Sequence, residues 1–580
     1  MIALIGLALA IGMQTPRDAP SQPAPGTAVI GGVVTTGDPS GAKTPLRRAA
    51  VTIMGTGILG QRQVTTDDKG RFIFADLVPG RFTLIVEKPG YLKTYVGSRR
   101  PGRPPSLPIA LVAGQRVLDL SVSVPRGAVV EGTVRDEMGG AIPTAQVTAQ
   151  QRIYVGGAPR YVPATNTPSR VITDDRGRFR LYGLPPGDYV VEATAGTAAL
   201  GGAEVASDAE IRTADEELQR GAGQATAAPQ KPRQVRSMTR TSVFAPGVSN
   251  IHDAQTISLG LGEERTGVDI VSRLVSAARV DLIVTGPSGQ PLQIGVIAVA
   301  NLSRQSLVFS PGIVRPGADG RFAMPPLPPA TYLFAGVSSD PANVTSPVLF
   351  WLNTEVTVDG QDLSNVSLAF SRGQTVSGRL LTTAAMPALA AAKLTLVPVT
   401  EIAGLPAIPA SAIIDPAGTF QFPSVAPGKY RMSLGGLPGW SLASAMSAGR
   451  DTLDDPLEVR SGADIEGLVA TITDRPTEVS GTVTDAAGRP SPEFTALVFP
   501  ADPSLRLTAP RRTSGLVKIG SDGGFKVEGL PPGDYLLAVI ADADPQQLQD
   551  RAFLEQIAAG AIPIRLAEGQ KVVQDLKIGG

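Results

Sequence analysis

Side chains that could perform covalent or metal chemistry are scarce in this sequence. The chain contains no Cys, and His252 is its one His. A zinc hydrolase needs two or three His ligands, and a Ser-His-Asp triad needs a His beside its Ser. Disulfides, thiolate nucleophiles and zinc–sulfur sites are excluded by composition alone. We therefore expect no catalytic, metal-binding or cofactor-binding residue, no cofactor and no enzyme activity, with His252 an exposed loop residue.

Carboxylates are the remaining groups with catalytic or metal-binding capacity. A glycoside hydrolase needs only two facing carboxylates, so this activity stays open as a remote alternative, although no spacing in the sequence identifies such a pair. Clustered Asp side chains could bind calcium. Asp also caps tight turns through its side chain, which we prefer because the third and fourth of the repeats described below lack the paired Asp. The Asp residues concerned are Asp67, Asp68, Asp174, Asp175 and Asp522.

Exposed aromatic rings are the candidate groups for binding a sugar. Trp351 and Trp440 are the two Trp residues of the chain, and we take them as the candidate ligand-binding residues. Two Trp in 580 residues is a small supply for a dedicated glycan-binding protein. Further candidates are Tyr91, Tyr95, Tyr154 and Tyr161. The basic segment Arg99–Pro105 could contact an anionic polymer, but a solvated loop is the simpler interpretation.

Five segments of the chain share one pattern of turn and aromatic residues. Each has a turn followed by Gly-x-Phe, a Pro seven positions after the Phe and an aromatic residue ten positions after it. The Phe residues are Phe72, Phe179, Phe322, Phe420 and Phe525, and the later aromatics are Phe82, Tyr189, Tyr332, Tyr430 and Tyr535. Because their offset from the turn is fixed, we expect these later aromatics to be core or corner residues, comparable to a tyrosine corner, and not sugar platforms.

A second block with apolar residues two apart precedes each segment, as expected for one face of a strand. Its central positions are Gly32, Gly132, Leu282, Gly378 and Gly481. In the second repeat, Thr173–Leu181 predicts a β-hairpin turn, and Pro186-Gly187 predicts a type II turn at a corner. Repeats of about 100 residues with short strands and frequent turns are typical of antiparallel β-sandwiches.

The repeat predicts an all-β chain of about five tandem prealbumin-like (Ig-like) β-sandwiches. Minor helices are expected near 206–220 and 544–559. The predicted segments are a signal peptide (1–12), a Pro-rich spacer (13–26) and sandwiches at 27–124, 125–275, 276–371, 372–474 and 475–580, the second with a low-complexity insertion at 195–240 that we expect to be mainly a mobile loop. The apolar run Met1–Gly12 is too short to span a bilayer and is typical of the apolar region of a signal peptide, with a buried N-terminal strand as the alternative.

Charge and composition narrow the range of partners. The 52 Lys and Arg residues balance the 52 Asp and Glu residues, so the chain has no net field to attract nucleic acid. Gly and Pro together make up 116 of 580 residues, yet hydrophobic residues still reach 42%, enough for packed cores. After removal of the signal peptide we expect no transmembrane span.

The motif Asp174–Tyr189 resembles the signature of bacterial carboxypeptidase regulatory-like domains. Asp67–Phe72 and Gly529–Tyr535 match it in the first and fifth repeats, whereas Leu282, Ala330 and Pro416 depart from it in the third and fourth. The resemblance implies a prealbumin-like sandwich related to the carbohydrate-binding-like fold and to Cna-B-type modules. It implies no peptidase activity, since the zinc ligands of such a peptidase cannot be assembled with one His.

These observations favour a non-enzymatic exported protein, located in the periplasm, at the cell surface or outside the cell. We expect it to act as a binding or spacer module at the cell envelope. Kinship of fold suggests polysaccharide binding, and the alternative is an adhesin-like structural stalk that binds proteins. Polysaccharide and envelope protein are therefore the two candidate partners. Exposed aromatics on one face would favour the glycan, and uniformly polar faces would favour the stalk.

Overall fold

The fold was taken from a computed structural model of the chain. It describes residues 26–37, 43–98, 108–164, 169–195, 203–204, 211–212, 215, 237–292, 295–339, 349–382, 384–399, 408–541 and 544–578. The predicted signal peptide lies outside these residues, as do almost all of the Pro-rich spacer and the segment Arg99–Pro105. The chain divides into two compact units, Met1–Arg126 and Gly127–Gly580.

The unit Met1–Arg126 contains one sandwich of two sheets, with strand orders β4-β1-β8 and β3-β2-β5-β6, where β7 also pairs with β5. Its strands are β1 (Ala28–Gly37), β2 (Ala50–Gly55), β3 (Arg62–Thr65), β4 (Arg71–Leu77), β5 (Gly80–Glu87), β6 (Thr94–Tyr95), β7 (Ile109–Leu111) and β8 (Arg116–Pro125). We call this pair of sheets the first sandwich.

The second unit begins with the second sandwich, whose sheets have the orders β13-β9-β19 and β11-β10-β14-β17, extended by β20, β12 and β18. Its elements are β9 (Ala128–Arg135), β10 (Gln146–Val155), β11 (Ala158–Pro163), β12 (Arg170–Ile172), β13 (Arg178–Leu184), β14 (Gly187–Thr194), β17 (Val243–Phe244), η1 (Ile251–Asp253), β18 (Ile257–Leu259), β19 (Glu264–Arg265) and β20 (Ile270–Val271).

The third sandwich has the sheets β15-β16-β21-β24, joined by β27, and β23-β22-β25-β26-β28. Its elements are β15 (Ala203–Glu204), β16 (Ser237–Arg240), β21 (Leu274–Thr285), β22 (Gly295–Asn301), β23 (Ser306–Val314), β24 (Arg321–Leu327), β25 (Ala330–Ser339), β26 (Leu349–Val358), β27 (Leu363–Ala369) and β28 (Ser371–Arg372).

The fourth sandwich has the sheets β32-β33-β29-β38-β35-β36 and β31-β30-β34-β37. Its elements are β29 (Gln374–Thr382), η2 (Leu389–Ala391), β30 (Lys393–Pro398), β31 (Ala410–Ser411), β32 (Ile413–Ile414), β33 (Thr419–Val425), β34 (Gly428–Gly435), β35 (Ser441–Ser447), β36 (Arg450–Asp451), β37 (Leu457–Val459) and β38 (Ile465–Thr473).

The fifth sandwich has the sheets β42-β39-β45, extended by β46, and β41-β40-β43-β44. Its elements are β39 (Glu478–Thr484), β40 (Phe494–Pro500), α2 (Leu505–Thr508), η3 (Pro510–Arg512), β41 (Val517–Lys518), β42 (Gly524–Glu528), β43 (Gly533–Ala541), η4 (Gln547–Gln549), α3 (Arg551–Ala558), β44 (Ile562–Leu566), β45 (Lys571–Val573) and β46 (Leu576–Lys577).

All five sandwiches share one strand pairing, which confirms the all-β fold. The first strand of each, such as β1, pairs antiparallel with the strand after the turn, such as β4, and parallel with the closing strand, such as β8. The pairings of β9, β21, β29 and β39 repeat this order. Each pair of sheets encloses its own cluster of buried apolar side chains, because alternate residues of both sheets point inward.

The turn before each repeated Phe has the same hydrogen bonds in every copy. Its glycine takes a positive φ, from 70° at Gly177 to 87° at Gly418. The carbonyl of this glycine accepts a bond from the first strand, as in Val134 N–Gly177 O at 2.7 Å and Leu380 N–Gly418 O at 2.7 Å. A left-handed residue is needed for the turn, which is why Gly keeps this place in all five repeats.

The turn before the repeated Phe and the corner turn that follows it each lead from one sheet to the other. The β-hairpin prediction for the first turn of the second repeat is therefore wrong. Strand β12 pairs with β10, whereas β13, after the turn, pairs with β9 in the opposite sheet. The fourth sandwich is the exception, since β32 and β33 form a hairpin. At the second turn Gly187 has φ 152°, far from the value of about +80° that a type II turn requires. The chain passes from sheet to sheet there and does not reverse within one sheet.

The glycine of the first strand makes room for the repeated Phe ring. A Cβ atom on Gly378 would lie 2.0 Å from the carbonyl oxygen of Leu468 and 2.6 Å from Cζ of Phe420. The third sandwich has Leu282 at this place, in the same register with its partner strands. Leu282 is buried, and Phe322 is only half-buried, whereas the other four repeated Phe rings are buried. The leucine side chain thus takes space that the ring fills elsewhere.

Replacing Gly378 by Ala should therefore destabilise the fourth sandwich by about 3 kcal/mol, the upper part of the range for overpacking a core. Gly435→Ala is the matched control, since its added Cβ would have no neighbour closer than the Lys393 carbonyl oxygen at 4.0 Å. Calorimetric unfolding of the full chain measures both variants. Equal shifts for the two would show that the close approach at Gly378 relaxes freely.

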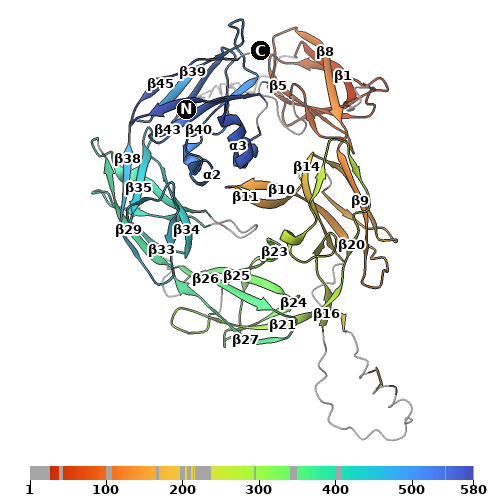
Figure 1. The fold of residues 1–580 in the computed structure, drawn as a ribbon, viewed down its shortest axis with the longest axis vertical. Helices are drawn as coiled ribbons and strands as arrows, with labels where there is room; N and C mark the ends of the chain where they lie inside the picture. The colour runs from red at the N-terminus through yellow and green to blue at the C-terminus, as the bar shows by residue number, and fades with distance from the viewer. Residues whose placement is uncertain are drawn as a thin grey trace, which may run out of the picture. The chain divides into compact units, whose positions relative to one another are not determined.

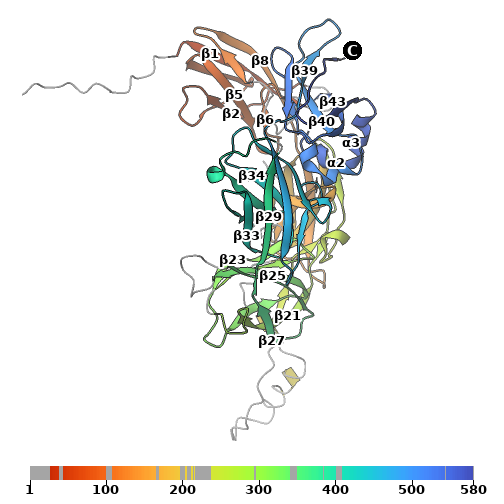
Figure 2. The same ribbon diagram turned by 90° about the vertical axis from the view of Figure 1, so that its left-hand side faces the viewer.

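The helices differ in part from expectation. The helix expected near 544–559 is present as two short elements, η4 and α3, whose apolar side chains pack on β40 and β43. Both views show α3 beside these strands (Figures 1 and 2). Most of the helix expected near 206–220 lies outside the described residues. Within this segment 211, 212 and 215 are described, and they are helical. The insertion 195–240 does not end as a loop, because β16 pairs with β21 of the third sandwich.

Candidate functional site

The aromatic residue ten positions after each repeated Phe is a buried corner residue. Tyr189, Tyr332, Tyr430 and Tyr535 are all less than 5% exposed. Each hydroxyl donates to the carbonyl oxygen four residues earlier, as in Tyr189–Pro185 at 2.6 Å and Tyr430–Ala426 at 2.9 Å. The first sandwich has Phe82 at this place, also buried. The expectation of core aromatics is confirmed, with a hydrogen bond that fixes the corner between the sheets.

Burial should delay ionisation of these four corner tyrosines. Desolvation raises the pKa of Tyr430 to about 12 from its ordinary 10.0, and it also raises the pKa of Tyr189, Tyr332 and Tyr535. Because the pKa is raised, the folded state favours the neutral hydroxyl of Tyr430. This contribution to the stability of the fold is complete below pH 10 and is lost as the pH rises through about 12. We expect part of the phenolate absorbance to appear only near pH 12, and Tyr430→Phe to remove part of that late fraction.

Of the repeated Asp residues, Asp67, Asp174 and Asp522 cap the turns. Asp174 Oδ1 accepts hydrogen bonds from the backbone N–H of Arg176 at 3.0 Å and of Arg178 at 2.8 Å. Asp67 makes the same bonds to Lys69 and Arg71, and Asp522 accepts one from Gly524. The bonds from the backbone N–H groups lower the pKa of both Asp67 and Asp174. These bonds are the ones that the capping interpretation requires.

Segments outside the common repeat form a connected polar site in the second unit. Strand β40 is followed by α2 and η3, whereas the described connections after β2, β10 and β22 hold no helix, and we call residues 501–516 the α2–η3 insertion. It carries Arg511 and Arg512 directly after Pro510. Opposite them, the fourth sandwich carries Asp451 at the end of β36 and Asp454 in the connection from β36 to β37.

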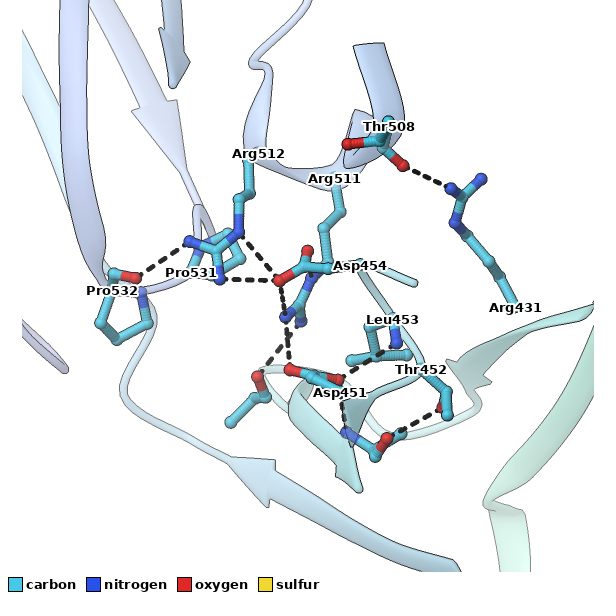
Figure 3. Close-up of polar contacts among 12 residues, drawn as sticks. Arg431, Asp451, Thr452, Leu453, Asp454, Thr508, Arg511, Arg512, Pro531 and Pro532 are labelled. Atoms are coloured by element: carbon cyan, nitrogen blue, oxygen red, sulfur yellow. Dashed lines mark hydrogen bonds and ion pairs between the residues drawn. The ribbon is translucent and has the colours of Figure 1, made fainter. Parts of the chain in front are cut away.

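The carboxylate of Asp454 binds both guanidinium groups (Figure 3). Arg511 Nε donates to Asp454 Oδ1 at 2.7 Å, and Arg512 Nη2 and Nε donate to Oδ2 at 2.8 and 2.9 Å. The side chains of Arg511, Arg512 and Asp454 are only 19%, 18% and 17% exposed. Solvent therefore screens this contact less than it screens a surface ion pair.

Burial by itself raises the pKa of Asp454. The hydrogen bonds from Arg511 and then Arg512, with their positive charge, outweigh burial, and the net effect lowers the pKa of Asp454 below its ordinary 3.8. On the arginine side, burial lowers the pKa of Arg512, and the bonds to Asp454 more than restore it. The carboxylate of Asp454 is thus charged at neutral pH, and its ion pairs with Arg511 and Arg512 persist there.

Neighbouring groups complete this contact. Asp451 Oδ2 accepts from Arg511 Nη2 at 2.7 Å, while Asp451 Oδ1 is held by the backbone N–H groups of Ala445 and Leu453. Arg431 of the fourth sandwich donates to the Thr508 carbonyl at 2.7 Å (Figure 3). The fourth and fifth sandwiches are therefore joined by hydrogen bonds to the backbone as well as by ion pairs between side chains.

Arg512 also joins the contact to the core of its own sandwich. Its Nη1 atom donates to the Pro532 carbonyl at 3.1 Å and lies 3.5 Å from the hydroxyl of Tyr535. The Tyr535 hydroxyl in turn donates to the Pro531 carbonyl at 2.5 Å. The corner of the fifth sandwich and the inter-sandwich contact therefore share one hydrogen-bond chain.

The chemistry of this site is recognition between protein surfaces. It holds three guanidinium–carboxylate contacts, backbone bonds and no group poised to transfer a proton at neutral pH. Sequence analysis did not identify it, because single Arg and Asp residues in loops have many ordinary uses. The available signal was positional, since the segments 501–516 and 451–455 both lie where the chain departs from the repeat.

Comparison with known proteins identifies part of the chain. The profile of the carboxypeptidase regulatory-like domain matches residues 29–112 and 129–214. These two segments are carboxypeptidase regulatory-like domains. The matched segments hold the turn and corner motifs of the first and second sandwiches, so the resemblance seen in the sequence is confirmed. No curated protein sequence matches the chain.

Several solved structures are similar to the chain over long segments at low identity. A streptococcal ancillary pilin aligns over 59% of this chain and 99% of its own, with 12% identity and a TM-score of 0.21. A minor pilin of Streptococcus agalactiae aligns over 43% of this chain and 96% of its own, with 11% identity and a TM-score of 0.19. A putative polysaccharide-binding protein of Bacteroides thetaiotaomicron aligns over 31% and 81%, with 10% identity and a TM-score of 0.16.

A cavity of about 480 Å³ opens on the second regulatory-like domain and the strand beside it. Three carboxylates line it, and each already has partners. Glu131 pairs with Arg180, and Asp174 with Arg178, while Asp269 accepts from the backbone N–H and the hydroxyl of Thr133. Within the described part of the chain, no group of three or more His, Cys, Asp or Glu side chains could hold a metal ion.

The two candidate Trp residues have structural contacts. Trp351 is half-buried, and its Nε1 lies 3.4 Å from the Ser424 hydroxyl of the fourth sandwich, which itself donates to the Leu349 carbonyl. Trp440 is half-buried against the core of the fourth sandwich. The two residues lie in different sandwiches, and no described contact joins them. Ligand binding at either residue stays a prediction.

The other aromatic candidates are half-buried as well. Tyr91 packs on the core of the first sandwich, and Tyr161 packs beside Phe244 in the second. Tyr95 and Tyr154 lie beside Lys93 and Arg152, whose cationic groups are within 6 Å of the rings. His252 is exposed on η1, with its Nε2 3.2 Å from the Gln305 amide. No aromatic side chain whose burial the structure describes is exposed.

Proposed function

We propose that the chain is a non-enzymatic, exported module of the cell envelope that acts as a spacer or stalk, with fixed spacing between its fourth and fifth sandwiches. The observation that carries this proposal is the binding of Asp454 by two guanidinium groups of the α2–η3 insertion. Neighbouring domains joined only by a linker move relative to one another by default. A shared, half-buried ionic contact opposes such movement, since separating the surfaces would leave charges without partners.

The use of the repeated polar residues supports a non-enzymatic role. Asp67 and Asp174 cap turns, and the corner tyrosines bond to backbone carbonyls. In the cavity of the second sandwich, Glu131, Asp174 and Asp269 are held by arginines or by Thr133. A glycosidase needs one carboxyl group free to act as an acid and another free to act as a base or nucleophile. The carboxylates of this cavity are already committed to the fold.

The placement of aromatic rings favours a stalk over a glycan-binding module. Sugar binding by stacking needs a ring face open to solvent, and the described rings are all buried or half-buried. Kinship to the carbohydrate-binding-like fold is the reason to retain polysaccharide binding as the alternative. An export signal and location in the periplasm or at the cell surface are part of the proposal, with an envelope protein as the partner.

Spacing can be measured directly, because the chain has no Cys of its own and introduced thiols label specifically. Ile413 of the fourth sandwich and Val573 of the fifth are 69% and 73% exposed, so both accept Cys and a spin label without loss of core packing. We expect one narrow distance distribution between the labels in the full chain. A broad distribution would contradict the proposed fixed spacing.

Incubation of the chain with a panel of bacterial and plant polysaccharides, with product analysis on the same samples, tests the alternative. We expect neither retention nor cleavage. Retention without cleavage would make the chain a glycan-binding module and would direct substitutions to Trp440 and Trp351. Release of oligosaccharides would contradict the non-enzymatic role and would require a functional carboxylate pair.

A further inference from the structure

The outer face of the sheet β4-β1-β8 in the first sandwich has an apolar centre. Ile73 on β4 is 55% exposed, Leu118 on β8 is 47% exposed and Val33 on β1 is 36% exposed. A Cβ atom added to Gly31 would lie 3.3 Å from Cδ2 of Leu118 and 3.6 Å from Cγ1 of Ile73. These two side chains therefore converge over the glycine. We call Gly31, Val33, Ile73 and Leu118 the β1 patch.

The other four sandwiches do not repeat this apolar centre. Strand register identifies the residues of the other sandwiches that correspond to this patch. In the first sandwich Gly31 pairs with Ile73, and Leu118 directly follows Val117, the partner of Ile30. Each of the other sandwiches has at least two polar or charged residues at the places of Ile73, Gly31 and Leu118. These residues are Arg180, Glu131 and Thr266; Ala323, Asp281 and Ser364; Gln421, Ser377 and Glu466; and Lys526, Ser480 and Val573.

This comparison within one chain separates the β1 patch from the ordinary surface of the fold. The common sheet face tolerates charge, as the Arg180–Glu131 ion pair of the second sandwich demonstrates. Nothing in the folding of the sandwich therefore requires Ile73 and Leu118 to be apolar. Exposed apolar side chains that gather in one place are typical of a contact surface.

The charges beside the patch indicate what kind of surface covers it. Arg116 lies two residues before Leu118 on β8, and Asp119 directly after it. Both are exposed, and neither has an ion-pair partner among the residues that the structure describes. A two-fold axis through the patch would bring Arg116 of one chain to Asp119 of the other. The zero net charge of the chain adds no long-range repulsion between copies.

We infer that the β1 patch binds the same patch of a second copy of this chain. Three strands about 4.8 Å apart offer a face smaller than half of a standard interface. The resulting dimer is therefore weak and depends on concentration, as suits contacts between proteins crowded on one surface. This inference does not depend on the proposed spacer role.

Sedimentation velocity of the full chain from about 1 to 200 µM tests the dimer, since micromolar affinity gives a large mass shift over this range. We expect the mean mass to rise with concentration for the wild type. Ile73→Lys combined with Leu118→Lys should abolish the rise, because two buried cations would face their own copies. The matched control is Val573→Lys, at the corresponding place in the fifth sandwich, which should leave the rise unchanged.

Charge reversal tests the two-fold arrangement separately. Arg116→Asp alone and Asp119→Arg alone should each weaken the dimer at least tenfold, and the two together should restore it. A wild-type chain that stays monomeric throughout overturns the inference and leaves the patch to a different partner. Dimerisation that survives the double Lys variant, or is lost equally in Val573→Lys, overturns it too. Unchanged thermal unfolding of each variant excludes misfolding as the cause.

Discussion

Asp454→Asn is expected to weaken the contact between the fourth and fifth sandwiches by about 3 kcal/mol, as found when one partner of a half-buried ion pair is removed. The substitution keeps the size of the side chain but leaves Arg511 and Arg512 without the carboxylate that binds both. The distance distribution between labels at Ile413→Cys and Val573→Cys should broaden. Calorimetry should show the unfolding transitions of the two sandwiches moving apart.

Asp455→Asn is the control for this substitution. Its carboxylate is 64% exposed and contacts Arg450, also highly exposed, so its loss should change the contact by less than about 1 kcal/mol. Equal effects of the two variants would contradict the role assigned to Asp454. So would a wild-type distribution that is already as broad as that of the Asn variant.

The same carboxylate predicts how the contact depends on pH. Binding to Arg511 and Arg512 holds the pKa of Asp454 below 3.8, so the charged form is the one favoured in the assembled state. The stabilisation is therefore complete above pH 3.8 and is lost as the pH falls through the lowered pKa. Acid should broaden the label distances in the wild type, and the Asn variant should lack this acid step.

Tyr189→Ala should destabilise the second sandwich by about 3–5 kcal/mol, the usual cost of removing a large buried ring. The ring is fully buried, and its hydroxyl bonds to the Pro185 carbonyl at 2.6 Å. Calorimetric unfolding of the full chain should show one transition lowered by at least about 10 °C. Tyr189 is the right position for this test, because among the described residues its hydroxyl bonds only within its own sandwich.

Tyr189→Phe separates the ring from its hydroxyl. We expect a loss of only about 1 kcal/mol, that of one hydrogen bond, since Phe82 fills the same place in the first sandwich. A near-zero effect of Tyr189→Ala would contradict the core role of the ring. A Phe variant as unstable as the Ala variant would place the main contribution in the hydroxyl.

Strand pattern and turn chemistry predicted the repeated architecture because they are local properties. The fixed distance from Phe179 to Tyr189 predicted a corner residue, and the tyrosine is one. Local pattern failed at the turns, where the same Asp–Gly sequence can lead back into one sheet or across to the other. Strands β12 and β13 take the second course, because each finds its partner in a different sheet.

The sequence by itself determined the all-β repeat, its buried Phe and Tyr columns and the absence of thiol and multi-His chemistry, because spacing and composition record these directly. Tertiary structure alone decided which polar residues meet. Arg511 and Asp454 are far apart in the chain, and Ile73 joins Leu118 only through the register of β1 with its two neighbours. Contacts between surfaces depend on three-dimensional placement, which no periodicity along the chain encodes.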